Sequence, residues 1–238
     1  MRNSVVIACI GVVGAFTASS ACAANLLTNG GFEIDGPAAN DATNPGIGST
    51  AITGWKVVNN SGTTVDDGND VLWIGNGGYD LYTPFGTDFL DLTGTVDHFP
   101  YPGVTQSVST ILGQAYTLSF YLGVSDNFGG GPVSATVRVG PTAESPIMSM
   151  TFVDPGTSGI SINGSLWTLQ TFDFVATSTT TAVTFVGAEG GDFIGLDDVD
   201  LEVSAVPEAN TWAMAVVGFG AIGGAMRNRA RKALPTPG

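Results

Sequence analysis

The chain has 238 residues, a formal net charge of −14 and only 12% charged residues, which fits one domain with targeting segments better than two domains. Residues 25–205 hold 20 of the 21 acidic residues against two bases, Lys56 and Arg138, so their formal charge is −18. A surface this acidic repels phosphate backbones, which argues against nucleic-acid binding. Cys9 and Cys22 both precede this stretch and His98 is the single histidine, so thiol nucleophiles and structural zinc sites are excluded there. The acidity itself has two compatible interpretations, solubility and divalent-cation binding.

Residues 1–24 have the organisation of a secretory signal peptide. A short basic start, MRN, is followed by an apolar run over residues 7–16 and by the small-residue stretch TASSACAA. This order is typical of signal peptides, and Ala21 and Ala23 predict cleavage after Ala23 or Ala24. A lipoprotein signal would normally place an aliphatic residue three positions before Cys22, where this chain has Ser19. We therefore predict export without lipidation.

Residues 25–205 are predicted to be all-β. Apolar and polar residues alternate with a period of two in several segments, which is typical of half-buried antiparallel strands. Clusters of Gly, Pro, Asn and Asp separate these segments, and neither an amphipathic helix nor an internal repeat is visible. Some ten strands in about 180 residues predict a two-sheet antiparallel β-sandwich. The expected strands are 52–58, 71–74, 89–92, 103–110, 116–122, 133–139, 147–153, 166–175, 183–185 and 193–203.

Residues 206–232 form a tail in three parts. A Pro-Glu pair comes first, an apolar run follows over residues 212–226, and a basic cluster ends the segment. The apolar run is shorter than the about 20 residues of a full membrane span, but flanking residues and snorkelling arginines extend it. We predict a short transmembrane-like helix whose basic end stays cytoplasmic. Residues 233–238 are expected to be a disordered end.

The tail also contains a G-x-G-x-x-G pattern at Gly218, Gly220 and Gly223. A dinucleotide site would need a strand–helix–strand unit and an acidic residue about 20 positions further on. Only 15 residues follow Gly223 and none of them is acidic. The pattern therefore predicts no nucleotide site.

The tail as a whole, VPEANTWAMAVVGFGAIGGAMRNRARK, resembles the PEP-CTERM sorting signal of Gram-negative bacteria. It departs from that motif at Ala209, where a second Pro is usual. The resemblance implies an exosortase as processing partner, transient anchoring in the inner membrane, and a final place at the cell surface or in the extracellular matrix. The residues that carry it are Val206, Pro207, Glu208, Trp212, Gly218, Gly220, Arg227, Arg229 and Arg231.

Five short motifs of the exported part carry a second resemblance. They are NLLTNGGFE at 25–33, ITGW at 52–55, FLDLTG at 89–94, GVTQSVST at 103–110 and FIGLDDVDLEV at 193–203. In this order they resemble the galactose-binding-like jelly rolls of carbohydrate-binding modules and of DUF642-type surface domains. The resemblance implies a jelly roll whose first and last strands are neighbours, with a structural calcium ion between them.

The candidate calcium ligands on that resemblance are Glu33 from the opening motif and Asp197 or Asp198 from the closing one. Asp197 shares the strand parity of Val199 and Leu201, so we expect it to point into the sandwich and Asp198 to point outward. A carboxylate turned inward must be paired or metal-bound, and calcium binds carboxylate and carbonyl oxygens. The alternative is that Asp197 is hydrogen-bonded near a strand end.

Carbohydrate binding would use aromatic side chains that stack on sugar rings. Candidates in turn-like surroundings are Trp73, Tyr79, Tyr82, Phe85, Phe99 and Tyr101, with plain packing as the alternative for each. No nucleophile or metal-hydrolase motif is visible, so we predict a non-catalytic protein. The leading interpretation is an exported, exosortase-sorted surface or exopolysaccharide-matrix protein that binds carbohydrate. The alternatives are a purely structural biofilm protein without a sugar site and a polysaccharide hydrolase.

Overall fold

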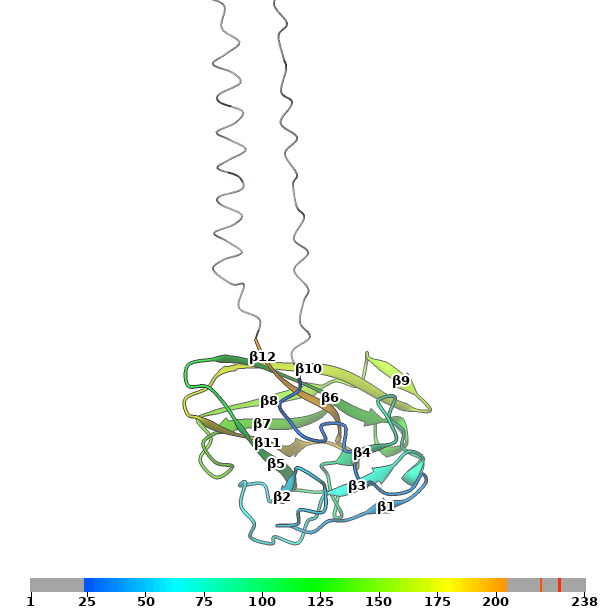
Figure 1. Ribbon diagram of the computed structural model, residues 1–238. Coiled ribbons are helices and arrows are strands. Elements are labelled where there is room, and N and C mark those ends of the chain that lie inside the picture. The colour runs from blue at the N-terminus through cyan, green and yellow to red at the C-terminus, as the bar shows by residue number, and fades with distance from the viewer. Residues whose placement is uncertain (1–23, 205–218, 220–226, 228–238) are drawn as a thin grey trace, which may run out of the picture.

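The computed structural model describes residues 24–204 together with Phe219 and Arg227 (Figure 1). The predicted signal peptide and most of the predicted sorting tail lie outside the described residues. Among the residues that are described, no helix is long and apolar enough to cross a membrane. Arg227 is exposed; the other predicted sorting residues lie outside the description, namely Val206, Pro207, Glu208, Trp212, Gly218, Gly220, Arg229 and Arg231.

Two antiparallel sheets face each other in a β-sandwich with jelly-roll connections, which confirms the predicted fold class (Figure 1). Every predicted strand is present, and the structure adds two very short strands, one at Ala42–Thr43 and one at Ile160–Ile162. The seven-stranded sheet has the order β1 (Ala42–Thr43), β3 (Leu72–Gly75), β4 (Asp88–Asp91), β12 (Gly195–Val203), β6 (Ala115–Ser125), β10 (Ser165–Val175) and β9 (Ile160–Ile162). The five-stranded sheet has the order β2 (Lys56–Val58), β5 (Gly103–Ser109), β11 (Thr180–Glu189), β7 (Val133–Gly140) and β8 (Met148–Asp154).

The main core lies between the two sheets. Period-two alternation along β6 turns Leu118, Phe120 and Leu122 inward, and all three are fully buried. Phe120 meets Phe185 of the facing sheet edge to face, with ring centroids 4.9 Å apart. Burying one such side chain contributes roughly 1.5–3 kcal/mol, so this shared apolar layer is what holds the sheets together.

The opening segment of the domain runs beside the last strand β12. It forms no strand itself, and the first strand β1 pairs with β3, so the expectation that the first and last strands are neighbours is met only by this irregular segment. The Leu26 amide donates to the Leu201 carbonyl at 2.8 Å, and the Val199 amide donates to the Gly30 carbonyl at 3.0 Å. The Asn25 side chain reinforces this contact by accepting from the Leu201 amide and donating to the Val199 carbonyl. The two ends of the described domain therefore lie side by side.

A second, smaller hydrophobic cluster covers the outer face of the seven-stranded sheet. Its centre is Trp167, which meets Phe89 and Phe193 edge to face at 5.6 and 6.2 Å. The indole fits because the residues beneath it are Gly123 and Gly195, where an added Cβ would lie 2.8 and 2.7 Å from the ring. The Trp167 Nε1 donates to the Tyr82 carbonyl at 2.8 Å. The segment between β3 and β4 is thereby fixed over this face.

Candidate functional site

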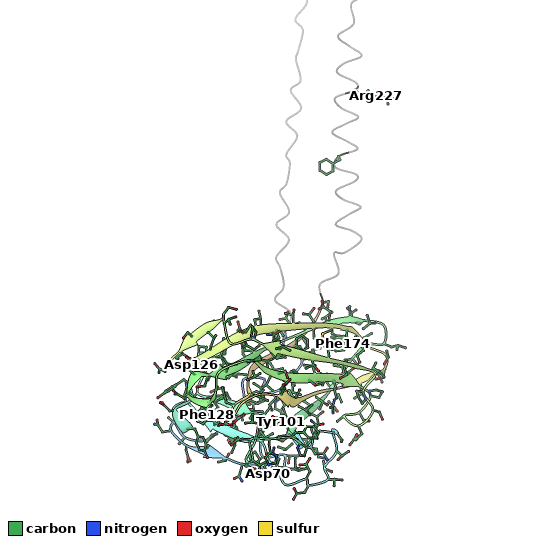
Figure 2. The ribbon with its side chains drawn as sticks, turned by 180° about the vertical axis from the view of Figure 1, so that it is seen from behind. Asp70, Tyr101, Asp126, Phe128, Phe174 and Arg227 are labelled. Atoms are coloured by element: carbon green, nitrogen blue, oxygen red, sulfur yellow. The ribbon has the colours of Figure 1, made fainter. Side chains whose placement is uncertain are left out.

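A cavity of about 230 Å³ opens on the outer face of the seven-stranded sheet, beside the second cluster. Four connections far apart in the sequence form its rim: those between β3 and β4, β4 and β5, β6 and β7, and β11 and β12. One of them includes the short helix η2 (Asp126–Phe128), whose Asp126 and Phe128 lie at the end of the sandwich remote from Phe174 (Figure 2). The lining residues are Leu72, Tyr79, Leu81, Asp91, Gly94, Thr95, Asp97, Phe128 and Asp192.

Asp91 is the buried polar residue of this cavity. It ends β4 opposite Leu72 and Gly195, and only 2% of its surface is exposed. Its Oδ1 accepts hydrogen bonds from the Thr93 amide, the Thr93 hydroxyl and the Ile194 amide. Burial raises the pKa of Asp91 to about 7, although these hydrogen bonds oppose the shift. Its Oδ2 receives no hydrogen bond from any residue in the described part of the chain.

Two more carboxylates stand at the mouth of the cavity. Partial burial raises the pKa of Asp97, and the nearby Asp192 raises it further, while the Thr93 hydroxyl and His98 act in the opposite direction. The Thr93 hydroxyl oxygen lies 2.8 Å from Asp91 Oδ1, 3.3 Å from Asp97 Oδ1 and 3.3 Å from the Asp192 carbonyl oxygen. A hydroxyl has one proton to donate, so Thr93 cannot donate to these three acceptors at once. Its lining includes neither Lys nor Arg.

Tyr79 forms one wall of the cavity and is 59% exposed. It lies in the short helix η1 (Gly78–Asp80) and has a left-handed backbone conformation, with φ at 52°. The same side chain lines a smaller hollow of about 170 Å³ beside Asn40 and Asp41. Tyr79 therefore stands between two adjoining depressions.

The other predicted sugar-binding aromatics take different positions. Tyr82 is half-buried, and its hydroxyl donates to Asp80 at 3.2 Å. Trp73 is 3% exposed and belongs to the main core, where its Nε1 donates to the Phe32 carbonyl at 3.1 Å. Tyr101 is 7% exposed. Tyr79 is thus the predicted aromatic that lines the cavity.

A third hollow of about 320 Å³ lies on the five-stranded sheet, between Trp55, Lys56 and Gln106. The Trp55 ring is 2% exposed, and its Nε1 donates to the Asn29 carbonyl. Its aromatic surface is therefore turned into the protein and offers no stacking face to a ligand. This hollow lacks the combination of an exposed ring and free carboxylate oxygens.

The predicted calcium ligands lie in a separate cluster near the opening segment. The Glu33 carboxylate accepts from the amides of Thr87 and Asp88 and from the Thr87 hydroxyl at 2.7–3.0 Å. Asp197 is fully buried, and its Oδ2 accepts from the Thr83 hydroxyl at 2.5 Å. Burial raises the pKa of Asp197 well above its usual range, and the negative charge of Glu33 contributes to the shift.

The expectation that Asp197 points into the sandwich is wrong, although its burial was predicted. Asp197 pairs with Tyr121, which faces outward, whereas its neighbour Leu196 pairs with the core residue Leu122. A β-bulge between Asp197 and Asp200 inserts an extra residue and changes the strand parity, so Val199 returns to the main core. Asp197 is buried because the connection between β3 and β4 covers it. Asp198 is exposed, as predicted.

Asp88 lies beside Glu33 and was missed by sequence reasoning, whereas Glu33 and Asp197 were predicted. Its Oδ1 is buried without a hydrogen-bond partner, and burial raises its pKa to about 6, with Glu33 adding to the shift. Gly36 and Gly86 make room for these carboxylates, since an added Cβ would lie 2.3 Å from Asp88 Oδ2 and 2.1 Å from Glu33 Oε1. The described residues contain no group of three His, Cys, Asp or Glu side chains that could hold a metal ion. A calcium ion here would need backbone carbonyls and hydroxyls as further ligands.

Comparisons with known proteins give likenesses of structure only. Neither a protein-family model nor a curated protein sequence matches the chain. Among solved structures, the carbohydrate-binding module TmCBM61 in complex with β-1,4-galactotriose is 16% identical, with a TM-score of 0.47, and 76% of this chain covers 99% of that one. A CBM4 structure is 16% identical over 75% of this chain and 99% of its own, with a TM-score of 0.41. An arabinose-bound GH51 α-L-arabinofuranosidase is 12% identical, with a TM-score of 0.48, over 79% of this chain and 28% of the enzyme.

Proposed function

We propose that the protein is an exported, non-catalytic carbohydrate-binding protein of the cell surface or extracellular matrix. Its sandwich binds a saccharide in the cavity beside Asp91 and Tyr79, and its tail is sorted by an exosortase. The export and sorting parts of the proposal are supported by the signal-peptide pattern and by the PEP-CTERM resemblance of residues 206–232. The binding part is supported by the cavity.

The observation that carries the binding proposal is the pairing of an exposed ring with unsatisfied acceptors in one cavity. Saccharides present apolar ring faces that stack on aromatic side chains, and hydroxyl groups that donate to carboxylates. Tyr79 supplies the ring, and Asp91, which is only 2% exposed, lines the same cavity and supplies a carboxyl acceptor. At about 230 Å³ the cavity is smaller than the about 300–1,000 Å³ usual for drug-sized ligands, which suits a single sugar ring.

A glycan array probed with the purified full-length protein tests this proposal. Binding of at least one saccharide class is expected, and Tyr79→Ala should weaken it about tenfold or more, because stacking on an aromatic ring is lost. Phe99→Ala is the matched control, since Phe99 is 67% exposed but does not line the cavity. Absence of binding to every glycan at millimolar concentration would refute the proposal and favour a purely structural protein.

The sorting proposal is tested in cells. A chain that lacks residues 206–238 should lose tail processing and its normal location, while export directed by residues 1–24 continues. The intact mass of the mature protein reports both cleavages at once. Unchanged processing and location after the deletion would contradict the exosortase assignment.

We also propose that calcium binds beside Glu33 and Asp88, with backbone carbonyls and hydroxyls as further ligands. A bound Ca²⁺ would offset the repulsion between these two carboxylates and would give the buried Asp88 Oδ1 a partner. Chelation should then lower the melting temperature of the wild type, and Asp88→Asn should abolish the difference. Glu144→Gln, which removes an exposed carboxylate in the turn between β7 and β8, should keep it. An unchanged wild-type melting temperature in chelator would rule out a stabilising ion.

A further inference from the structure

The geometry points to a ligand class for the Asp91 cavity: we propose that it selects amino sugars whose amine is free and protonated. This inference rests on the proposed saccharide binding at the same cavity and goes further by naming the group that is recognised. Neutral sugars and N-acetylated sugars are the competing ligands.

Carboxyl groups determine the charge of the cavity. Asp91, Asp97 and Asp192 all line it, and the surrounding lining includes neither Lys nor Arg. His98, whose charge acts on Asp97, and Tyr79 are the other titratable groups that face this region. A ligand that carries a positive charge gains from this arrangement, whereas a neutral sugar leaves the repulsion between Asp97 and Asp192 in place.

Asp91 and Asp97 share a single side-chain hydroxyl as hydrogen-bond donor. The Thr93 hydroxyl lies within hydrogen-bond distance of Asp91 Oδ1, of Asp97 Oδ1 and of the Asp192 backbone carbonyl, yet it carries a single proton. Asp91 is 98% buried and its Oδ2 still has no donor among the described residues. An ammonium group brings three donors and a positive charge. Hydrogen bonds between ionised partners are about twice as strong as neutral ones.

The walls of the cavity favour an organic cation over a bare metal ion. Four of the lining residues, Leu72, Tyr79, Leu81 and Phe128, offer apolar surface, whereas a metal ion needs oxygen ligands on most sides. Cations carried on a carbon ring are also attracted to the faces of aromatic rings. The second hollow, which shares Tyr79, gives room for a neighbouring sugar unit. An oligomer of amino sugars therefore matches the walls as well as the charge.

Three oligosaccharides with the same β-1,4 backbone provide a direct test, because they differ only at carbon 2. Cello-oligosaccharide carries a hydroxyl there, chito-oligosaccharide an acetamido group and its de-N-acetylated counterpart an ammonium group. Calorimetric titration of the full-length protein at about pH 7.5, above the pKa of about 7 of Asp91 and below the about 7.7–8.0 of an ordinary α-amino group, should show the ammonium ligand binding about tenfold or more tightly than the other two. Saturating calcium should not displace it.

Matched variants separate site recognition from general attraction between an acidic protein and a cationic ligand. Asp97→Asn and Asp192→Asn should each reduce the preference for the ammonium ligand, while Glu144→Gln, which removes the same charge elsewhere, should leave it intact. Equal affinity for all three ligands would overturn this inference and keep the proposed function. An equal loss in all three variants, or displacement by calcium, would also overturn it. Absence of binding by any ligand of a full glycan array would overturn both.

Discussion

The two faces of the seven-stranded sheet differ although they are made of alternate residues of the same strands. Leu90 faces the main core, and the next residue, Asp91, faces outward into the cavity. In the same way, Leu196 faces the main core and the next residue, Asp197, faces outward. The inner face is apolar and serves stability, whereas the outer face combines an aromatic cluster with desolvated carboxylates. Strand parity thus lets one sheet carry the core and the candidate binding sites back to back.

The two faces of the seven-stranded sheet are also expected to contribute to the stability of the fold in opposite directions. Apolar burial on the inner face stabilises the fold. Burial of carboxylates on the outer face raises the pKa values of Asp91 and Asp197, so their ionised forms are destabilising unless a ligand or a cation compensates. Such groups are retained at functional sites at some cost in stability.

The largest expected effect is on the inner face. Phe120→Ala removes a fully buried ring that meets Phe152 and Phe185 edge to face. We expect a loss of about 3–5 kcal/mol in the free energy of unfolding, measured by urea denaturation. Leu169→Ala on the exposed side of β10 is the control and should change little, because Leu169 is 51% exposed. A cost for Phe120→Ala similar to that of Leu169→Ala would contradict the assigned core.

A smaller loss is expected from the outer aromatic cluster. Gly123→Ala places a methyl group 2.8 Å from the Trp167 ring, which must move away from the sheet. Overpacking of this kind costs typically about 1–3 kcal/mol. It should also shift the Trp167 fluorescence, because the Nε1 hydrogen bond to the Tyr82 carbonyl is strained. An unaltered stability and spectrum would show that the ring does not rest on Gly123.

Asp91→Asn should make the stability less dependent on pH. Asp91 has a pKa of about 7 in the folded protein against 3.8 in the unfolded chain, so the folded state keeps its proton over that interval. The unfolded chain therefore binds fewer protons, and wild-type stability falls as the pH rises from about 4 to about 7, by on the order of a few kcal/mol. The difference between Asp91→Asn and wild type should grow over this range and level off above it. A constant difference would contradict the raised pKa.

The smallest effect on stability is expected at the mouth of the cavity. Tyr79→Ala removes a largely exposed ring, and we expect the free energy of unfolding to change by less than about 0.5 kcal/mol. Its effect on saccharide binding should nevertheless be large. A variant that loses binding together with several kcal/mol of stability would show that Tyr79 acts through folding and not through contact with the ligand.

The inner face could be read from the sequence, because period-two alternation is the signature of a strand with one buried side. β1 and β9 escaped detection since each has only two or three residues. The orientation of Asp197 was mispredicted because a bulge breaks the alternation that the prediction assumed. Neither Asp88 nor Asp91 was recognised as a site residue, because Asp91 lies within the predicted strand 89–92 and Asp88 directly precedes it.

The cavity could not be predicted from the sequence, for a different reason. Its lining spans Leu72 to Asp192 and is assembled by four connections whose mutual approach depends on the fold. Tyr79 carried a local signal, a loop aromatic next to glycines. Trp73 and Tyr101 carried the same kind of signal and proved to be buried. Composition around an aromatic residue therefore does not separate a stacking platform from a core residue.

The most direct test of the account is amide chemical-shift mapping of the full-length protein with a de-N-acetylated β-1,4-glucosamine oligomer. The largest shifts are expected at Tyr79, in residues 93–97, at Phe128 and at Asp192, with little change across the five-stranded sheet. Shifts centred on Trp55, Lys56 and Gln106 would contradict the assignment of the outer-face cavity as the binding site, and a spectrum that the oligomer leaves unchanged would contradict the selection of amino sugars.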